Sequence, residues 1–198
     1  MENYNERIVK KDFSLSKVTG EFRYADVKAA RFHCARLVEC DLRHVCAEGV
    51  FFGGATLHET DARWAGLRRA EMPCTHINAC DFTQADMRGV NLQGCILEGS
   101  VFYGANLEGA NLRGARIRGS DLRTANLRGA NLEGAELDCV GLEGAFLEGA
   151  NLEGANLQVV RAWGARTINT KIEGATLDHV SSLWLDRKWT IGQPVLAQ

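Results

Sequence analysis

The sequence predicts an all-β solenoid whose coils have four sides of five residues each. Three observations predict it. An apolar residue recurs at every fifth position from Phe22 to Leu177 with few exceptions, a small residue stands two positions before it, and Gly, Asn or Asp fill the turns. Five residues rotate an α-helix by 140° net and reverse the face of a strand, so neither element fits this period. A chain that turns a corner every five residues keeps the apolar side chain inside at each step.

The apolar column runs without insertion or deletion through 32 quintets, about four fifths of the 198-residue chain. Four corners close one coil of 20 residues, so these quintets make eight coils. Stacked coils pair like neighbouring parallel strands at roughly 4.8 Å per coil, which predicts a shaft of about 38 Å. The Leu and Phe side chains of the column would form one continuous core along its axis, as in other solenoids.

The small-residue column supports the same register, and Cys40, Cys80 and Cys95 stand where Ala is usual. The chain has seven cysteines and no C-x-x-C pair. An odd number without that spacing favours neither a disulfide framework nor a zinc site. His33 and His44 lie more than half a coil apart, so they face different sides and cannot share a metal ion. We therefore expect no metal site and no cofactor.

The turn positions change in composition near residue 88. Two positions after the apolar residue, Gly fills 14 of the 18 quintets from Gly89 to Gly174 but only 2 of the 13 before them. Gly there suits a type II turn, which needs a positive φ. We expect the corners of the N-terminal coils to use a different turn, because they carry Tyr24, His44, Trp64, Arg69 and Cys74 instead. Asn or Asp often precedes the apolar residue, where its side chain can hydrogen-bond the local backbone.

These A(D/N)LxG quintets resemble the pentapeptide-repeat family over residues 20 to 179. The resemblance implies a right-handed quadrilateral β-helix. One branch of the family protects bacterial type II topoisomerases from poisons such as fluoroquinolones. Its members resemble double-stranded DNA in shape and charge, and they dimerise through an apolar C-terminal helical cap. The resemblance thus implies a DNA-mimicking partner of DNA gyrase, and of topoisomerase IV, that gives antibiotic resistance or self-immunity.

The chain divides into residues 1–19, an N-terminal cap or first partial coil, residues 20–179, the solenoid, and residues 180–198, an apolar C-terminal cap. Ser181 or Ser182 could begin a short helix over residues 183–188. Two Trp within six residues favour an interface, so we expect a homodimer through this segment. A monomeric lid over the last core layer is the alternative. The expected interface residues are Leu183, Trp184, Leu185, Trp189, Ile191, Val195 and Leu196.

Outward carboxylates are expected to imitate DNA, which carries about one charge per 1.7 Å of its axis. Residues 20 apart stack on one side, so Glu133, Glu153 and Glu173 would form a column. Stacked like charges cost stability, which favours a functional role, although a solvated face without function is the alternative. The expected DNA-mimicking residues are Glu98, Glu108, Glu133, Asp138, Glu143, Glu148, Glu153 and Glu173.

Residues 130–157 hold six acids, Glu136 among them, and no Lys or Arg, which predicts an acidic patch. Basic residues dilute this mimicry, because an arginine band from Arg113 to Arg128 precedes that acidic stretch. Direct nucleic-acid binding by this band is a competing hypothesis, which the net charge of −2 disfavours. A rigid scaffold that binds an unrelated protein through the aromatic-bearing N-terminal coils is the alternative function.

No catalytic motif, membrane-length apolar run or apolar leader is found in the sequence. Hexapeptide-repeat acyltransferases, the nearest enzymatic alternative, need a period of six. We therefore expect a non-enzymatic cytoplasmic protein without membrane contact.

Overall fold

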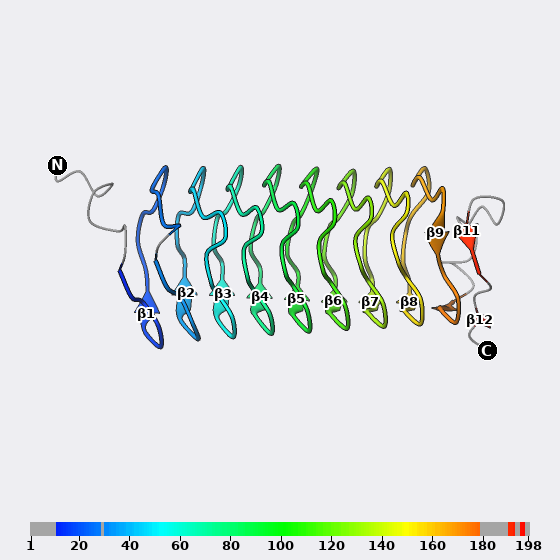
Figure 1. The fold of residues 1–198 in the computed structure, drawn as a ribbon, viewed down its shortest axis with the longest axis horizontal. Helices are drawn as coiled ribbons and strands as arrows, with labels where there is room; N and C mark the ends of the chain where they lie inside the picture. The colour runs from blue at the N-terminus through cyan, green and yellow to red at the C-terminus, as the bar shows by residue number, and fades with distance from the viewer. Residues whose placement is uncertain (1–10, 29, 179–189, 193–194, 197–198) are drawn as a thin grey trace.

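The computed structural model describes residues 11–28, 30–178, 190–192 and 195–196, which form one elongated parallel β-solenoid (Figure 1). Within the part of the chain described, no helix has the length and apolarity needed to cross a bilayer. The strands are β1 Lys17–Val18, β2 Arg36–Val38, β3 Thr56–His58, β4 His76–Asn78, β5 Ile96–Glu98, β6 Arg116–Arg118, β7 Glu136–Asp138, β8 Asn156–Gln158, β9 Thr170–Lys171, β10 Thr176–Leu177, β11 Thr190–Ile191 and β12 Val195–Leu196.

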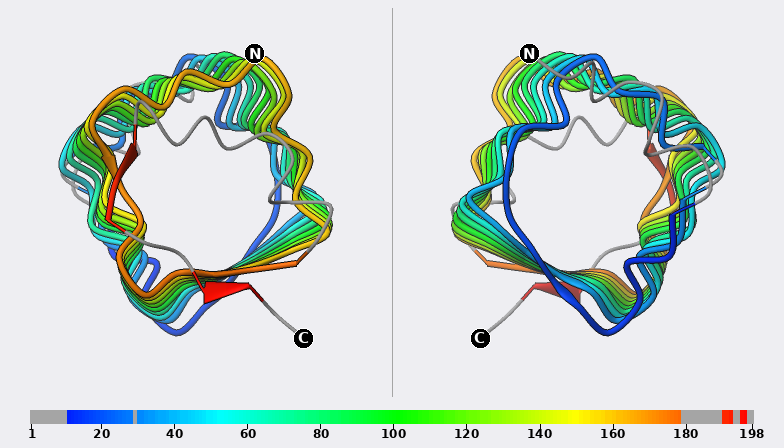
Figure 2. Two further views of the ribbon diagram at one scale, coloured as in Figure 1. Left: turned by 90° about the vertical axis from the view of Figure 1, so that its right-hand side faces the viewer. Right: turned by 90° about the vertical axis from the view of Figure 1, so that its left-hand side faces the viewer.

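The chain follows four parallel ladders as it winds, and this confirms the four-sided coil. Strands β1 to β8, β10 and β12 form one sheet along what we call the sheet side. There, Leu37 on β2 pairs with Leu57 on β3, a step of 20 residues. Single parallel bridges repeat this step on the other three sides, as between Asp41 and Asp61. End-on views show the coils stacked over one another around a common axis (Figure 2).

The interior is filled by the two columns predicted from the sequence. Every residue of the apolar column is buried, from Phe22, 7% exposed, to Leu177, 1% exposed. Rings of successive coils stack, with centroids 4.7 Å apart for Phe32 and Phe52. The small-residue column is buried beside them, apart from Ala165, which is only partly buried. Each buried Leu or Phe contributes roughly 1.5–3 kcal/mol, so the shaft is held mainly by this core.

The corners of the N-terminal coils were predicted to use a different turn from the glycine-rich corners, and this prediction is wrong. Trp64 and His44 have φ of 57° and 55°, close to the 64° of Gly89. Inter-coil hydrogen bonds fix this path whichever residue is present, as from Trp64 N to Thr83 O at 3.0 Å. The other three corner residues named in the prediction, Tyr24, Arg69 and Cys74, also have positive φ.

A one-residue register shift near the N-terminus extends the solenoid beyond the column seen in the sequence. Lys17 pairs with Arg36, a step of 19 residues rather than 20. The shortened corner lies at Gly20, whose φ is 121°. Phe13 therefore stacks on Phe32 with ring centroids 4.9 Å apart and packs against the core.

Paired backbone also continues past Leu177, because β11 pairs with β9 and β12 pairs with β10. The helix expected over residues 183–188 lies outside the described residues. The segment boundaries and dimerisation remain predictions. Of the predicted interface, Leu183, Trp184, Leu185 and Trp189 also lie outside the described residues, whereas Ile191, Val195 and Leu196 belong to β11 and β12.

Candidate functional site

Two neighbouring coils carry opposite charges on all four sides. Because residues 20 apart lie in register, each arginine of residues 111–130 has an acid beside it in residues 131–150. We call these ten residues the charge belt. Its members are Arg113, Arg116, Arg118, Arg123 and Arg128 with Glu133, Glu136, Asp138, Glu143 and Glu148.

Ion pairs join most of the belt across the two coils. The N–O distances are 3.5 Å for Arg113–Glu133, 3.3 Å for Arg116–Glu136, 3.2 Å for Arg118–Asp138 and 3.1 Å for Arg128–Glu148. Glu143 instead pairs with Arg161 of the following coil at 3.0 Å. The arginine band therefore neutralises much of the acidic stretch that follows it. The sequence signal for this was the arginine 20 positions before each acid.

The eight acids predicted to imitate DNA do not share one side. Glu98 and Asp138 lie on the sheet side, Glu108 and Glu148 on a second side, Glu133, Glu153 and Glu173 on a third, and Glu143 on the fourth. Glu98 and Glu108 are not belt members, and each has a polar neighbour of its own. Glu98 lies 3.4 Å from His76, and Glu108 lies 3.4 Å from the side-chain amide of Asn126.

The third side carries the acid column expected from the sequence. Parallel bridges connect Asn131, Asn151 and Lys171, which places Glu133, Glu153 and Glu173 in register. We call these three residues the acid column. The Asn131 and Asn151 carboxamides each accept a hydrogen bond of 3.0 Å from the backbone N–H of the acid two residues later. Among the residues described, Glu153 has no ion pair and no side-chain hydrogen bond. It is therefore the least neutralised residue of the acid column.

A local Asp-x-Arg pair recurs at positions 41/43, 61/63, 86/88 and 121/123. In each pair the guanidinium donates two hydrogen bonds to the carboxylate, as from Arg63 Nε and Nη2 to Asp61 at 2.9 and 2.6 Å. Such a fork is stronger and more directional than a single contact. The arginine side-chain hydrogen bond lowers the pKa of Asp41 and of Asp86.

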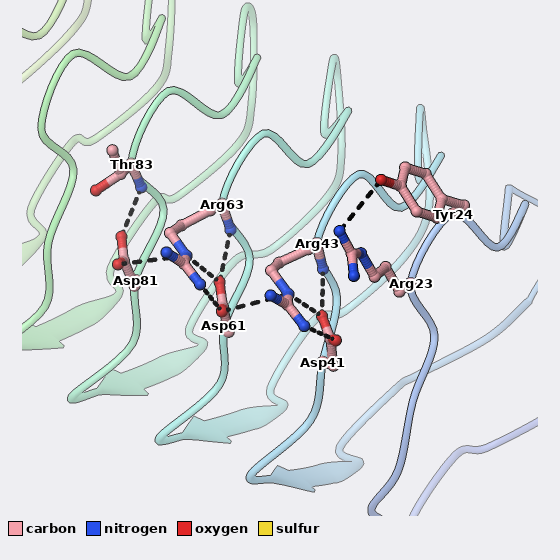
Figure 3. A network of polar contacts seen from close by, with 8 residues as sticks. All are labelled: Arg23, Tyr24, Asp41, Arg43, Asp61, Arg63, Asp81 and Thr83. Carbon is pink, nitrogen blue, oxygen red and sulfur yellow. Dashed lines mark hydrogen bonds and ion pairs between the residues drawn. The ribbon is translucent and has the colours of Figure 1, made fainter.

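Two of these carboxylates, those of Asp41 and Asp61, line up with the carboxylate of Asp81 on the fourth side (Figure 3). Arg43 Nε lies 3.5 Å from Asp61, and Arg63 Nε lies 3.9 Å from Asp81. The resulting Asp–Arg ladder runs through Asp41, Arg43, Asp61, Arg63 and Asp81. From the sequence, these Asp side chains were expected only to hydrogen-bond the local backbone, and the ladder was missed. The recurrence of Arg two positions after Asp was the sequence signal that could have revealed it.

An aromatic column borders the ladder at the adjoining corner. The rings of Tyr24 and His44 stack 4.8 Å apart, and those of His44 and Trp64 5.2 Å apart. Tyr24 and Trp64 remain 58% and 47% exposed. All three residues have the positive φ of left-handed backbone. This conformation destabilises a non-Gly residue by about 1–3 kcal/mol, so glycine would be less strained at these positions.

The cysteines are all free thiols, of which three are buried in the core and the others are exposed or half-buried. Cys40, Cys80 and Cys95 are buried in the small-residue column, as predicted. Burial raises the pKa of Cys80 to about 11 and that of Cys95 to about 12, which keeps both thiols protonated and inert. Within the described residues, no group of three or more His, Cys, Asp or Glu side chains could hold a metal ion.

Comparison with known proteins identifies the repeat and the fold. The model of the family described as Pentapeptide repeats matches in eight copies, over residues 35–72, 80–119, 105–140, 115–154 and 135–181. No curated protein sequence matches the chain.

Three solved structures of QnrB1, a plasmid-mediated fluoroquinolone resistance protein, resemble the chain. A trypsin-treated form has a TM-score of 0.78 at 19% identity, covering 92% of this chain and 91% of that one. A second trypsin-treated form has a TM-score of 0.69 at 20% identity, covering 95% and 90%. The full-length form has a TM-score of 0.58 at 18% identity, covering 92% and 94%. At these identities the similarity establishes the fold.

Proposed function

The chain belongs to the pentapeptide-repeat family, and from this membership we propose that it is a non-catalytic rod that binds DNA gyrase in place of DNA. Bound in this way, it would protect the enzyme from a topoisomerase poison and give resistance or self-immunity. The observation that carries the proposal is the similarity to QnrB1, a fluoroquinolone resistance protein, over 92% of this chain and 91% of that one. Topoisomerase IV is a second proposed target.

The acid column is the surface we assign to this contact. Glu133, Glu153 and Glu173 lie on one side of three successive coils, as phosphates lie along a duplex groove. The charge belt reduces the negative potential of the shaft, because its acids, Glu133 of the acid column among them, already pair with arginine. Mimicry is therefore proposed for this one side near the C-terminal end, rather than for the whole shaft.

Two further features complete the proposal. We propose a homodimer formed by residues 180–198, which would place two acid columns in one longer rod. We also propose that the protein acts in the cytoplasm, where its topoisomerase targets meet DNA.

The proposal is tested with purified gyrase, linear DNA and a fluoroquinolone, by measuring poison-stabilised DNA cleavage as the protein is added. Wild-type protein should reduce cleavage at micromolar concentration. The double variant Glu153→Lys/Glu173→Lys should protect at least tenfold less well, because it replaces anions of the proposed contact with cations.

The matched control is Glu39→Lys/Glu59→Lys, which changes the net charge equally at a corner of the N-terminal coils. It should protect like wild type. Equal protection by all three proteins would remove the acid column from the mechanism, and no protection by wild type would reject the gyrase proposal.

A rigid scaffold remains the second candidate, and the exposed aromatic column favours it. Tyr, Trp and Arg are enriched at the centres of protein interfaces. Here Arg63 lies over the Trp64 ring at 5.5 Å. Retention of another protein by wild type but not by Trp64→Gly, together with unchanged gyrase cleavage, would favour the scaffold.

A further inference from the structure

The Asp–Arg ladder stops one arginine short. Parallel bridges place Asp81 in the same column as Asp41 and Asp61, so the three carboxylates occupy equivalent points of successive coils. Two residues after Asp81 the chain carries Thr83, where Arg43 and Arg63 stand in the preceding coils. Asp81 thus has the backbone setting of the Asp-x-Arg pair without the arginine.

Asp81 makes polar contacts with Thr83 and Arg63 (Figure 3). Thr83 N donates a hydrogen bond of 2.8 Å to Asp81 Oδ1. Arg63 Nε lies 3.9 Å from Oδ2, but the Arg63 fork already bonds Asp61 at 2.9 and 2.6 Å. The Asp81 side chain is 40% exposed, compared with 19–34% for the aspartates of the four Asp-x-Arg pairs.

The next coil adds an aromatic neighbour, Tyr103. Val101 pairs with Asp81 across the coils, and the backbone of Tyr103 accepts a hydrogen bond from Gln84 N at 3.0 Å. The Tyr103 side chain is 42% exposed, and Arg123 lies 5.8 Å from its ring centroid. A second guanidinium beside this ring would gain a cation–π contact of the kind that the chain forms elsewhere.

We propose that Asp81, Thr83 and Tyr103 form a docking point for an arginine side chain of a partner protein. The chain itself supplies the template. At its four Asp-x-Arg pairs, the guanidinium bonds the equivalent carboxylate twice, at 2.5–2.9 Å.

Lysine fits the same setting poorly. At the one Asp-x-Lys sequence of the described coils, Lys28 Nζ lies 4.0 Å from Asp26 in a single contact. An ammonium is a point charge and cannot make the planar fork. The docking point is therefore selective for arginine, and it holds whether or not the partner is a topoisomerase.

The test uses the backbone amide of Thr83 as its reporter, because this amide bonds the carboxylate that the guanidinium would engage. The ¹⁵N-labelled full chain is titrated with acetyl-Gly-Arg-Gly-amide and with two counterparts. The citrulline peptide removes the positive charge, and the lysine peptide keeps the charge but lacks the planar guanidinium. We expect a saturable shift of the Thr83 amide with the arginine peptide, no shift with citrulline, and a shift at least threefold smaller with lysine.

Two variants probe the site from opposite directions. Thr83→Arg would supply the missing arginine internally and abolish the peptide-induced shift, and Asp81→Asn would abolish it by removing the charge. The matched control is Asp86→Asn, in the same coil, whose carboxylate is already held by Arg88 at 2.8 and 2.6 Å. It should leave the Thr83 shift unchanged. An equal response to citrulline, no response to arginine, or full binding by Thr83→Arg would each overturn the proposal.

Discussion

An aspartate and an arginine two positions later make the most local polar unit of this fold. The aspartate accepts a hydrogen bond from the backbone of the corner, as from Arg43 N to Asp41 at 3.0 Å, and the guanidinium then closes over the same carboxylate. One residue type thus serves both the turn and an ion pair. Where the arginine is missing, at Asp81, the same geometry becomes available to a partner.

These pairs predict acid sensitivity. The arginine side-chain hydrogen bonds lower the pKa of Asp41 and Asp86 from the ordinary value of 3.8. A carboxyl with a lowered pKa in the folded state contributes stability above the unfolded value and loses it as pH falls through the folded value. We expect Asp41→Asn/Asp86→Asn to lose less stability than wild type between pH 5 and pH 2, measured by urea unfolding. Equal losses in the two proteins would contradict this cause.

The sequence predicted the hydrogen bond from the backbone to the Asp side chain and missed the hydrogen bonds from the arginine to the same carboxylate. Asn and Asp before the apolar residue were expected to bond the turn, and the 3.0 Å bond from Glu133 N to Asn131 confirms it. The guanidinium fork depends on the angle at which the corner presents both side chains. That angle cannot be derived from the spacing of the repeat alone.

At the scale of the corner, inter-coil hydrogen bonding overrides residue preference. Glycine-rich and glycine-poor coils turn alike, because each corner amide must reach a carbonyl of the next coil. Ala79 N bonds Glu98 O at 3.0 Å and Gly119 N bonds Asp138 O at 2.9 Å. Composition therefore indicates where the turn is strained, and it was wrong as a guide to which turn is made.

Exchanging glycine and alanine at equivalent corners measures that strain. Ala79 is exposed with φ 51°, and Gly119 has φ 59° with open space where a Cβ atom would lie. We expect Ala79→Gly to raise the free energy of unfolding by about 0.5–1 kcal/mol and Gly119→Ala to lower it by about as much. Chemical denaturation measures both changes. If both substitutions shifted stability in the same direction, corner strain would not be the cause.

The N-terminal coil shows how a single missing residue hides an element from a periodic search. The apolar column was followed back only to Phe22, because the shortened corner at Gly20 moves the earlier quintet out of phase. Phe13 is nevertheless in the stack, with its ring 6.0 Å from that of Phe22. A search that allowed one deletion would have found it.

For the whole molecule, the sequence predicted the architecture well and the surface less well. A strict period determines the coil, its four sides and its core, because each depends only on residues in sequence order. Surface charge depends on neighbours one coil away. Reading Glu136 and Asp138 along the chain suggested an acidic patch, whereas their neighbours in space are Arg116 and Arg118.

The proposed dimer is a whole-molecule prediction. Size-exclusion chromatography with light scattering should give about twice the chain mass of 21.7 kDa for wild type. Trp184→Ser/Trp189→Ser should give the single-chain mass with an unchanged far-ultraviolet spectrum, because it removes apolar contact area from the proposed interface. A wild-type protein that stays at the single-chain mass at micromolar concentration would reject the dimer.

Competition between this protein and DNA for gyrase tests whether the protein binds in place of DNA. Fluorescence anisotropy of a labelled DNA duplex bound to gyrase is followed as the unlabelled protein is added. We expect wild type to displace the duplex completely and Glu153→Lys/Glu173→Lys to need at least tenfold more protein to do so. A complex that holds the duplex and the protein together, or no displacement at any concentration, would contradict it.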